Sequence, residues 1–397
     1  MNPFNYISIA EGDNFYDRVE ETKRIVDTLE GGNNIVLFSP RRYGKTSLVF
    51  RAMQQLEKQG FTCIYLDLTP VYSLESFVEL YLQALYQKQT IFDRFIQLLS
   101  SLKDIRPKMT FNEFGQLEFG IEYIEPTISI SSVAEIIELP EKMAQDGKRV
   151  VVVMDEFQEI RKLSKFNIEA LLRSKIQLQH HANYLFLGSK THIIQDMFLA
   201  QNRPFYNSAS TIQISTLPEK ETIEFITTRF ALNNIHITEE LCRYIIARVE
   251  NIPYYIQLLC AEIWQYMMPD LKDVNHDIID ECFIRTVESK SDYYFERTDR
   301  LSPLQKRLLI ALTDSGENIF SGKYITKNRL VGASSLQKAV AVLLDEGIID
   351  KKDATYSFCN PFYKYYVRYY ASERNASRRN STAATIHNGK FVIDNSK

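Results

Sequence analysis

Apolar and amphipathic segments alternate along the first half of the chain. Asn34–Phe38 and Arg149–Met154 contain unbroken apolar runs, which are typical of short strands buried on both faces of a sheet. Thr46–Lys58, by contrast, repeats its apolar residues at the spacing of a helix. Further strands are expected at Thr62–Leu68, Tyr184–Leu187 and Ile212–Ser215. The alternation predicts an α/β fold with a mostly parallel sheet and helices on both faces.

Other segments of this half also follow regular patterns. Glu20–Leu29 predicts a helix that ends at Gly31-Gly32. Leu74–Leu102 keeps a helical period throughout, whereas residues 105–132 alternate turns with β-prone stretches and predict a hairpin insertion. Further helices are expected at Val133–Asp146 and Asn167–His180.

Strand-like segments end at Pro218, and the pattern becomes helical. Glu219–Lys290 predicts a helical bundle. Ser302–Tyr370 predicts three helices and then two short strands, with Ser334 as the N-cap of the third helix, which is the order of a winged helix-turn-helix. The expected domain ranges are 1–217 for the α/β domain, 218–298 for the helical domain, 299–370 for the winged helix and 371–397 for a disordered tail.

Composition narrows the class of protein without identifying a ligand. The 397 residues are 45% hydrophobic and 24% charged, enough for two or three domains that each bury a core. The net charge of −3 gives no global sign of a nucleic-acid or membrane partner. No apolar run approaches about 18 residues, so we expect no membrane span. The N-terminus lacks a signal-peptide pattern. Five scattered cysteines without CxxC spacing are typical of reduced thiols in a cytoplasmic protein.

A phosphate-binding motif follows the first predicted strand. Residues 39–46 match the P-loop pattern GxxxxGK[ST], except that Ser39 replaces the first glycine. Backbone N–H groups of such a loop, and the N-terminus of the helix after it, face the phosphates. We expect Lys45 to contact the β- and γ-phosphates and Thr46 to offer its hydroxyl to Mg²⁺. The expected nucleotide-binding residues are Ser39, Pro40, Arg41, Arg42, Tyr43, Gly44, Lys45, Thr46 and Ser47.

Acidic residues follow the strongest strand signal of the chain. Asp155 and Glu156 come directly after Arg149–Met154. At such a strand end an Asp holds Mg²⁺ and a Glu polarises the attacking water, although two acids can also simply begin a turn. Ser189 follows another strand and is a candidate sensor of the γ-phosphate, or else an ordinary helix cap. Together with the P-loop, these residues predict a site for ATP and Mg²⁺.

Five segments carry a resemblance to a known family. They are Phe15–Arg18, Ser39–Thr46, Met154–Gln158, Gly188-Ser189 and Arg203–Tyr206. With these segments the chain resembles the archaeal-type ATPases of the AAA+/STAND group over about residues 1–370. The resemblance implies an αβα nucleotide domain, a helical lid and a C-terminal winged helix.

The resemblance also implies contacts with the nucleotide from outside the P-loop. Lids of this group often carry a Gly-x-Pro motif, which here is Asn251-Ile252-Pro253, so Pro253 is the expected lid contact. Arg203 lies where members present an arginine to the γ-phosphate from their own chain or a neighbour, and an oligomer would fit the second arrangement. A structural ion pair is the alternative for Arg203. Arg41 and Arg42 are further candidates, because a cation beside the phosphates stabilises developing charge.

The partner of the predicted winged helix stays open. Its third helix would place Ser335, Gln337 and Lys338 in the major groove of duplex DNA. Six basic residues oppose three acidic ones between Ser321 and Lys352, a mild excess for a module that needs several phosphate contacts. A winged helix that docks a protein is the alternative. The sequence therefore leaves two main functions: a slow Mg-dependent ATPase acting as a nucleotide-driven switch, or a DNA-binding protein in which nucleotide is structural or regulatory. A small-molecule kinase with a P-loop is a third, weaker interpretation, because the sequence shows no acceptor-binding signature.

Overall fold

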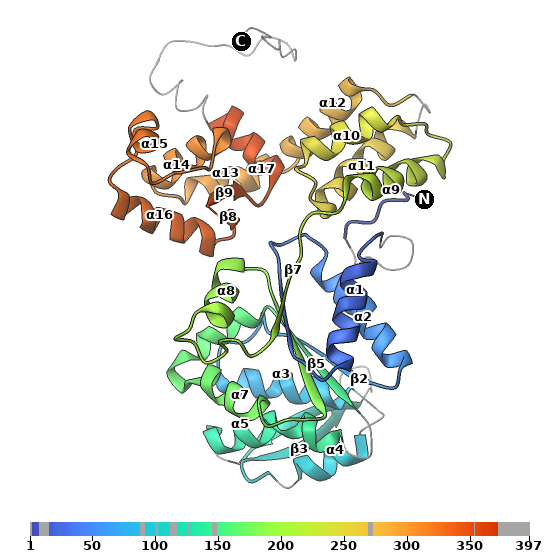
Figure 1. Ribbon diagram of the computed structural model, residues 1–397, viewed down its shortest axis with the longest axis vertical. Helices are drawn as coiled ribbons and strands as arrows, with labels where there is room; N and C mark the ends of the chain where they lie inside the picture. Colours follow the sequence, from blue (N-terminus) through green and yellow to red (C-terminus); the bar gives the residue numbers. More distant parts are fainter. Residues whose placement is uncertain are drawn as a thin grey trace.

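The computed structural model has three regions. It describes residues 2–7, 16–87, 92–100, 102–111, 117–124, 127–144, 149–268, 273–352 and 354–371. An α/β region forms the lower part of the molecule in Figure 1, and a helical region and a C-terminal region lie side by side above it. The tail expected at residues 371–397 lies outside the described residues, apart from its first residue.

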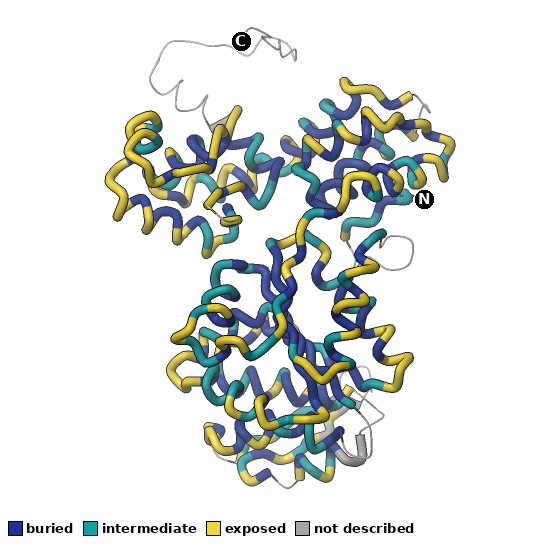
Figure 2. Tube along the Cα trace, in the orientation of Figure 1, coloured by how far each residue is buried: buried dark blue, intermediate teal, exposed yellow. Residues whose placement is uncertain are grey.

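A five-stranded parallel sheet forms the centre of the α/β region. Its strand order is β2-β5-β6-β1-β7, and every pair in it is parallel. The strands are β1 (Ile35–Phe38), β2 (Thr62–Asp67), β5 (Val150–Asp155), β6 (Ala182–Gly188) and β7 (Ser210–Gln213). All residues of β1, β5 and β6 are buried, as Figure 2 shows, which explains their unbroken apolar sequences. The predicted mostly parallel sheet is confirmed, and β6 separates β1 from β5.

Helices cover both faces of this sheet. One face packs against α1 (Val19–Glu30) and α2 (Lys45–Lys58), and the other against α3 (Leu74–Tyr86), α5 (Ile130–Ile137) and α7 (Ile168–Ile176). Side chains of β5 divide between the two cores by alternation, with Val151 and Val153 in one and Val150, Val152 and Met154 in the other. The sheet is therefore the middle of three layers.

Some predicted elements of this region are divided differently. The single helix expected at Leu74–Leu102 is two helices, α3 and α4 (Phe92–Leu99). The helix expected at Val133–Asp146 is α5 followed by α6 (Leu139–Met143), whose first turn contains Pro140. Proline lacks the N–H that would continue α5, so a break occurs there. The structure adds the 3-10 helix η3 (Phe157–Phe166) and α8 (Thr191–Leu199), and it pairs β3 (Ile105–Phe111) with β4 (Leu117–Tyr123) as an antiparallel hairpin.

The helical region includes a segment from the start of the chain. Its helices are α9 (Glu219–Ala231), α10 (Glu239–Arg248), α11 (Pro253–Met267) and α12 (His276–Glu288). Phe4 is buried in their core, with its ring 4.8 Å from that of Phe230 and 6.1 Å from that of Phe225. The Asn2 amide donates to the carbonyl of Ala261 on α11. Residues 2–7 therefore pack with the helical region.

The C-terminal region has the order of a winged helix. It contains α13 (Ser291–Asp299), α14 (Pro303–Asp314), α15 (Gly322–Lys327), α16 (Ala333–Asp345), the hairpin β8 (Ile349–Lys352) and β9 (Thr355–Phe358), and α17 (Pro361–Tyr366). Gly332, rather than the predicted Ser334, is the N-cap of α16, because the helix begins one residue before Ser334. Within the described residues, no helix combines the length and the apolarity needed to cross a membrane.

An aromatic cluster beside β6 gives the segment Arg203–Tyr206 a packing role. The rings of Phe157, Phe186, Phe198 and Phe205 pack with centroids 4.6–5.7 Å apart. Phe205 is fully buried, whereas Tyr206 is 36% exposed. We expect Phe205→Ala to lower the free energy of unfolding by about 3–5 kcal/mol because it leaves a cavity in this cluster. Urea unfolding followed by circular dichroism measures the loss. Tyr206→Ala is the control, with an expected change within about 0.5 kcal/mol, and equal losses in the two variants would contradict the packing role.

Candidate functional site

The loop between β1 and α2 encloses the amine of Lys45. Its Nζ donates to the carbonyl oxygens of Ser39 (2.8 Å) and Pro40 (3.0 Å), and the residue is only 7% exposed. Gly44 is the N-cap of α2 and has φ +83°, a left-handed conformation that glycine adopts without a Cβ clash. The loop thereby holds a buried cation at the N-terminus of a helix, which is a favourable place for an anion.

Burial shifts the proton affinity of this amine. It lowers the pKa of Lys45 from 10.5 to about 8, and the carboxylates of Glu156 and Asp155 oppose the shift. In the part of the chain that the structure describes, no carboxylate lies within ion-pair distance of Lys45. Its direct partners are two carbonyl groups and the Ser39 hydroxyl at 3.3 Å, all neutral, so the loop holds a cation whose charge is not balanced by direct contact.

Asp155 ends β5 and is held by residues from three elements. Tyr65 on the neighbouring strand β2 donates its hydroxyl to Asp155 Oδ2 at 2.6 Å, and Thr46 at the start of α2 lies 3.4 Å from the same oxygen. The backbone N–H of Glu156 donates to Oδ1 at 2.8 Å. Burial raises the pKa of the Asp155 carboxyl. Sequence analysis missed Tyr65, because only the pairing of β2 with β5 brings its side chain to Asp155.

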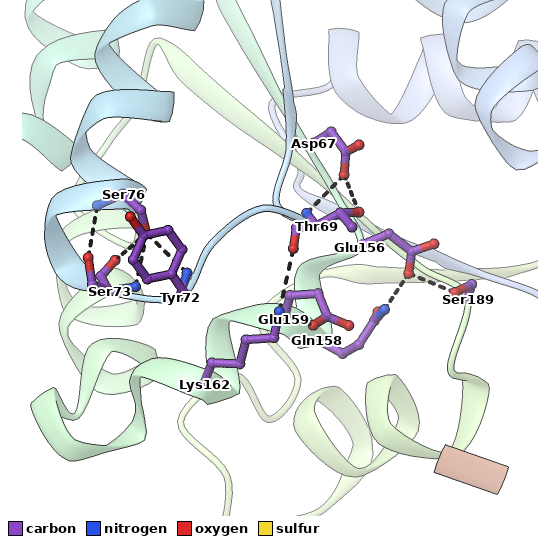
Figure 3. A network of polar contacts seen from close by, with 10 residues as sticks. All are labelled: Asp67, Thr69, Tyr72, Ser73, Ser76, Glu156, Gln158, Glu159, Lys162 and Ser189. Carbon is purple, nitrogen blue, oxygen red and sulfur yellow. Dashed lines mark hydrogen bonds and ion pairs between the residues drawn. The ribbon is translucent and has the colours of Figure 1, made fainter. Parts of the chain in front are cut away.

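Glu156 turns toward the end of β6. Its backbone has φ +51°, an uncommon conformation for a residue with a side chain, and such outliers often occur at functional sites. Ser189 donates to Glu156 Oε2 at 2.7 Å, and the amide of Gln158 donates to the same oxygen, as Figure 3 shows. Arg41 in turn donates through Nε to Ser189 Oγ at 3.4 Å. The ends of β5 and β6 and the phosphate loop are therefore joined by one hydrogen-bonded chain.

A cavity of about 380 Å³ extends from this polar cluster to the helical region. It is also lined by Tyr6, Ile7, Tyr16, Leu217 and Gln257, none of which was a predicted nucleotide-binding residue. Ser39 and Pro40 lie behind Lys45 and contribute their carbonyls to it, outside the cavity lining. The predicted site residues that line the cavity are Arg41, Arg42, Tyr43, Gly44, Lys45, Thr46, Ser47, Asp155, Glu156, Ser189 and Pro253.

Arg42 lines this cavity and also joins the phosphate loop to α11. Its guanidinium lies 4.7 Å from the ring centroid of Tyr254 and 4.8 Å from that of Tyr255, and it donates to the Tyr255 hydroxyl. Its carbonyl accepts from the backbone N–H of Tyr254 at 3.4 Å. Arg42 is exposed, and cation–π contacts at exposed sites contribute about 0.5–1 kcal/mol each. Arg42 therefore couples the position of the loop to that of the helical region.

The segment before Pro253 shows why asparagine can replace glycine there. Asn251 has φ +54°, a left-handed conformation that glycine and asparagine tolerate better than other residues. Its side-chain amide donates to the carbonyl of Leu217 at 2.8 Å. The turn therefore keeps Pro253 at the start of α11 and on the cavity wall.

Arg203 lies outside the cavity. Its guanidinium forms an ion pair with Asp196 on α8, and this hydrogen bond raises the pKa of Arg203. Glu169 adds a second negative charge nearby. Within the chain, Arg203 thus forms a structural ion pair, as the alternative interpretation of the sequence expected. Its contact with a γ-phosphate stays a prediction.

Comparisons with known proteins agree with this architecture. Residues 15–259 match the model of a family described as an ATPase domain predominantly from Archaea, and residues 292–369 match a probable winged helix domain. The fold is similar to a Walker-type ATPase of Pyrococcus abyssi, with a TM-score of 0.64 and 17% identity over 92% of this chain and 99% of that chain. It is less similar to the ORC1 protein of Aeropyrum pernix solved with DNA, with a TM-score of 0.48 and 12% identity over 93% and 96%. No curated protein matched the chain.

The lowered pKa of Lys45 makes binding of an anion dependent on pH. A triphosphate that pairs with the ammonium should raise this pKa, so binding at pH 8.5 should take up at most about three quarters of a proton, and almost none through Lys45 at pH 6.5. Titration calorimetry of the magnesium nucleotide in buffers with different ionisation enthalpies measures this uptake. Lys45→Arg, which stays protonated, is the control that should abolish it. Uptake at pH 8.5 that persists in this control would contradict the assignment.

Proposed function

The chain belongs to the family of ATPase domains found predominantly in Archaea, and on this premise we propose that it binds Mg-ATP and hydrolyses it slowly to ADP and phosphate. One observation carries the proposal. Lys45 and Thr46 after β1, and Asp155 and Glu156 at the end of β5, line the same cavity although another strand separates β1 from β5. The cavity volume of about 380 Å³ lies within the range of ligand pockets.

The oxygen donors beside Lys45 fit a magnesium ion. Mg²⁺ prefers carboxylate and hydroxyl oxygens, and Asp155 and Thr46 offer one of each, 3.4 Å apart. Tyr65 fixes one Asp155 oxygen and the Glu156 N–H fixes the other, so the carboxylate is oriented before metal binds. When bound, Mg²⁺ supplies positive charge for the β- and γ-phosphates.

Glu156 is the proposed base that polarises the attacking water. Ser189 and Gln158 both donate to Oε2, which fixes the side chain and leaves Oε1 to accept the proton of water. Lys45 holds the β- and γ-phosphates, and Ser189, hydrogen-bonded to Arg41 and Glu156, senses whether the γ-phosphate is present. Arg203 adds a cation only if a neighbouring chain presents it to this site.

The proposed hydrolysis drives a conformational switch between three domains. We assign residues 1–217 to the nucleotide domain, 218–298 to a lid and 299–370 to the winged helix, except that residues 2–7 pack with the lid and α13 belongs with the winged helix. Arg42 contacts the lid through Tyr254 and Tyr255, and Thr191 after Ser189 donates to Asp350 of the winged helix at 2.6 Å. Both contacts begin next to the proposed phosphate site, so its occupancy can shift the populations of lid and winged-helix positions.

The proposed chemistry predicts different losses for two substitutions. Glu156→Gln should keep ATP binding but lower the rate of phosphate release by about 10²-fold or more, since it removes the base. Lys45→Ala should weaken ATP binding itself. Phosphate release with Mg²⁺ or EDTA, and binding of a fluorescent ATP analogue, measure the two effects. Glu159→Gln is the matched control, because Glu159 pairs with Lys162 instead.

Wild-type protein without magnesium-dependent phosphate release would contradict this chemistry. Consumption of ATP that yields a phosphorylated metabolite and no free phosphate would instead indicate a small-molecule kinase.

A second candidate function is binding of duplex DNA, with nucleotide in a structural or regulatory role. The exposed positions Ser335, Gln337 and Lys338 on α16 favour it, because they remain open to a major groove. The lysines of the wing are exposed as well, and they lie beside the α/β region. Lys351 and Lys352 line a cleft between the C-terminal region and α8, and Asp345 lies 3.6 Å from His192 across the same junction.

DNA binding would show a distinct dependence on salt and on residue identity. We expect the protein to bind a duplex at 50 mM salt. Its affinity should fall at least about tenfold at 200 mM salt, because several phosphate contacts release counterions on binding. Lys338→Glu should weaken binding, whereas Glu156→Gln and Lys58→Glu, on the opposite part of the molecule, should not. Fluorescence anisotropy of a labelled duplex measures these effects. Absence of binding at 50 mM salt would contradict this function and would favour a protein as the partner of the winged helix.

A further inference from the structure

Gln257 lines the cavity, and the Oε1 atom of its buried amide lacks a hydrogen-bond partner among the described residues. The residue is 6% exposed and belongs to α11. A buried polar atom left unpaired is energetically unfavourable, because it has lost its hydrogen bond to water without gaining another. A ligand that offers a donor at this place would supply that hydrogen bond.

The position of Gln257 along α11 places it at the end of the cavity remote from Lys45. The first turn of α11 contacts the phosphate loop, where the Tyr254 N–H donates to the Arg42 carbonyl. Ala261, further along the helix, accepts from Asn2 of the N-terminal segment. Gln257 lies between these two anchors and follows Pro253 and Tyr254 on the face that lines the cavity.

Aromatic and apolar side chains surround this end of the cavity. Tyr6, Tyr16 and Leu217 line it with Gln257, and the Tyr6 ring lies 6.0 Å from that of Tyr254. Asn5 and Arg18 also line the cavity. Flat apolar walls with few polar side chains are suited to a heterocyclic base, because the walls contact its faces and a polar group contacts its edge. The cavity therefore joins a cationic end to a base-sized apolar end.

We propose that the Gln257 amide reads the edge of adenine that carries N6 and N7 and so selects adenine nucleotides over guanine nucleotides. This inference rests on the proposed nucleotide binding. The amide offers one acceptor and one donor, which match the N6 amino donor and the N7 acceptor of adenine. Guanine presents two acceptors on this edge, O6 and N7, and one of them must face the amide oxygen.

Nucleotide analogues and a matched pair of variants test the assignment. Dissociation constants are measured with Mg²⁺ for ATP, GTP and purine riboside triphosphate, which lacks the 6-amino group. Wild-type protein should bind ATP about tenfold or more tightly than the other two. Gln257→Leu should abolish the preference, so that the variant binds ATP, GTP and the analogue with similar affinity. Gln265→Leu, at an exposed position of the same helix, should keep the wild-type preference.

The outcomes separate this inference from the proposed function. Wild-type protein that binds none of the nucleotides contradicts both. ATP binding with an undiminished preference in Gln257→Leu, or an equal loss for all three nucleotides, overturns the role of Gln257 and leaves ATP binding intact. Gln257→Glu, which keeps the acceptor but loses the donor, covers the case of a leucine variant that does not fold. It should bind ATP and 7-deaza-ATP, which lacks N7, with equal affinity, whereas wild-type protein should prefer ATP.

Discussion

The burial of the Lys45 ammonium is the interaction on which the rest of the site depends. A cation at 7% exposure needs partners, and the loop supplies the carbonyls of Ser39 and Pro40 by wrapping around it. That path requires the left-handed Gly44 at the start of α2. Asp155 and Glu156, held at the end of β5, provide the nearest negative charge without forming direct pairs. The arrangement is well suited to an anion that carries its own divalent cation.

The same loop connects the three regions of the molecule. Arg42 extends from it to Tyr254 and Tyr255 on α11, while Ser189 and Thr191 connect the end of β6 to Arg41 and to Asp350 of the C-terminal region. Arg42 and Thr191 make local contacts that a change of charge at the loop can alter, whereas Tyr43 packs against the apolar core shared by the helical and C-terminal regions. A conformational switch can act through such local contacts.

Local patterns in the sequence were enough to predict the sheet, the phosphate loop and the acidic strand end. Each depends on residues that are neighbours in the chain: an apolar run, a GKT sequence, an Asp-Glu pair. Tyr65 and Gln257 could not be found this way, because their relevance arises from strand pairing and from packing of α11 over the loop. Asp196, the partner of Arg203, was not predicted because the sequence pattern did not predict α8, the helix on which Asp196 lies. Residues 2–7 were assigned by position in the chain, yet apolar packing of Phe4 joins them to the helical region.

A crystal structure with Mg²⁺ and a non-hydrolysable ATP analogue tests the central claim most directly. The triphosphate should lie along the loop with Lys45 in contact with its β- and γ-phosphates. The ion should lie between those phosphates, Thr46 and Asp155, and the base should lie beside Gln257. An analogue bound elsewhere, with the Lys45 amine still paired to the carbonyls of Ser39 and Pro40, would contradict the claim that this buried cation is a phosphate-binding group.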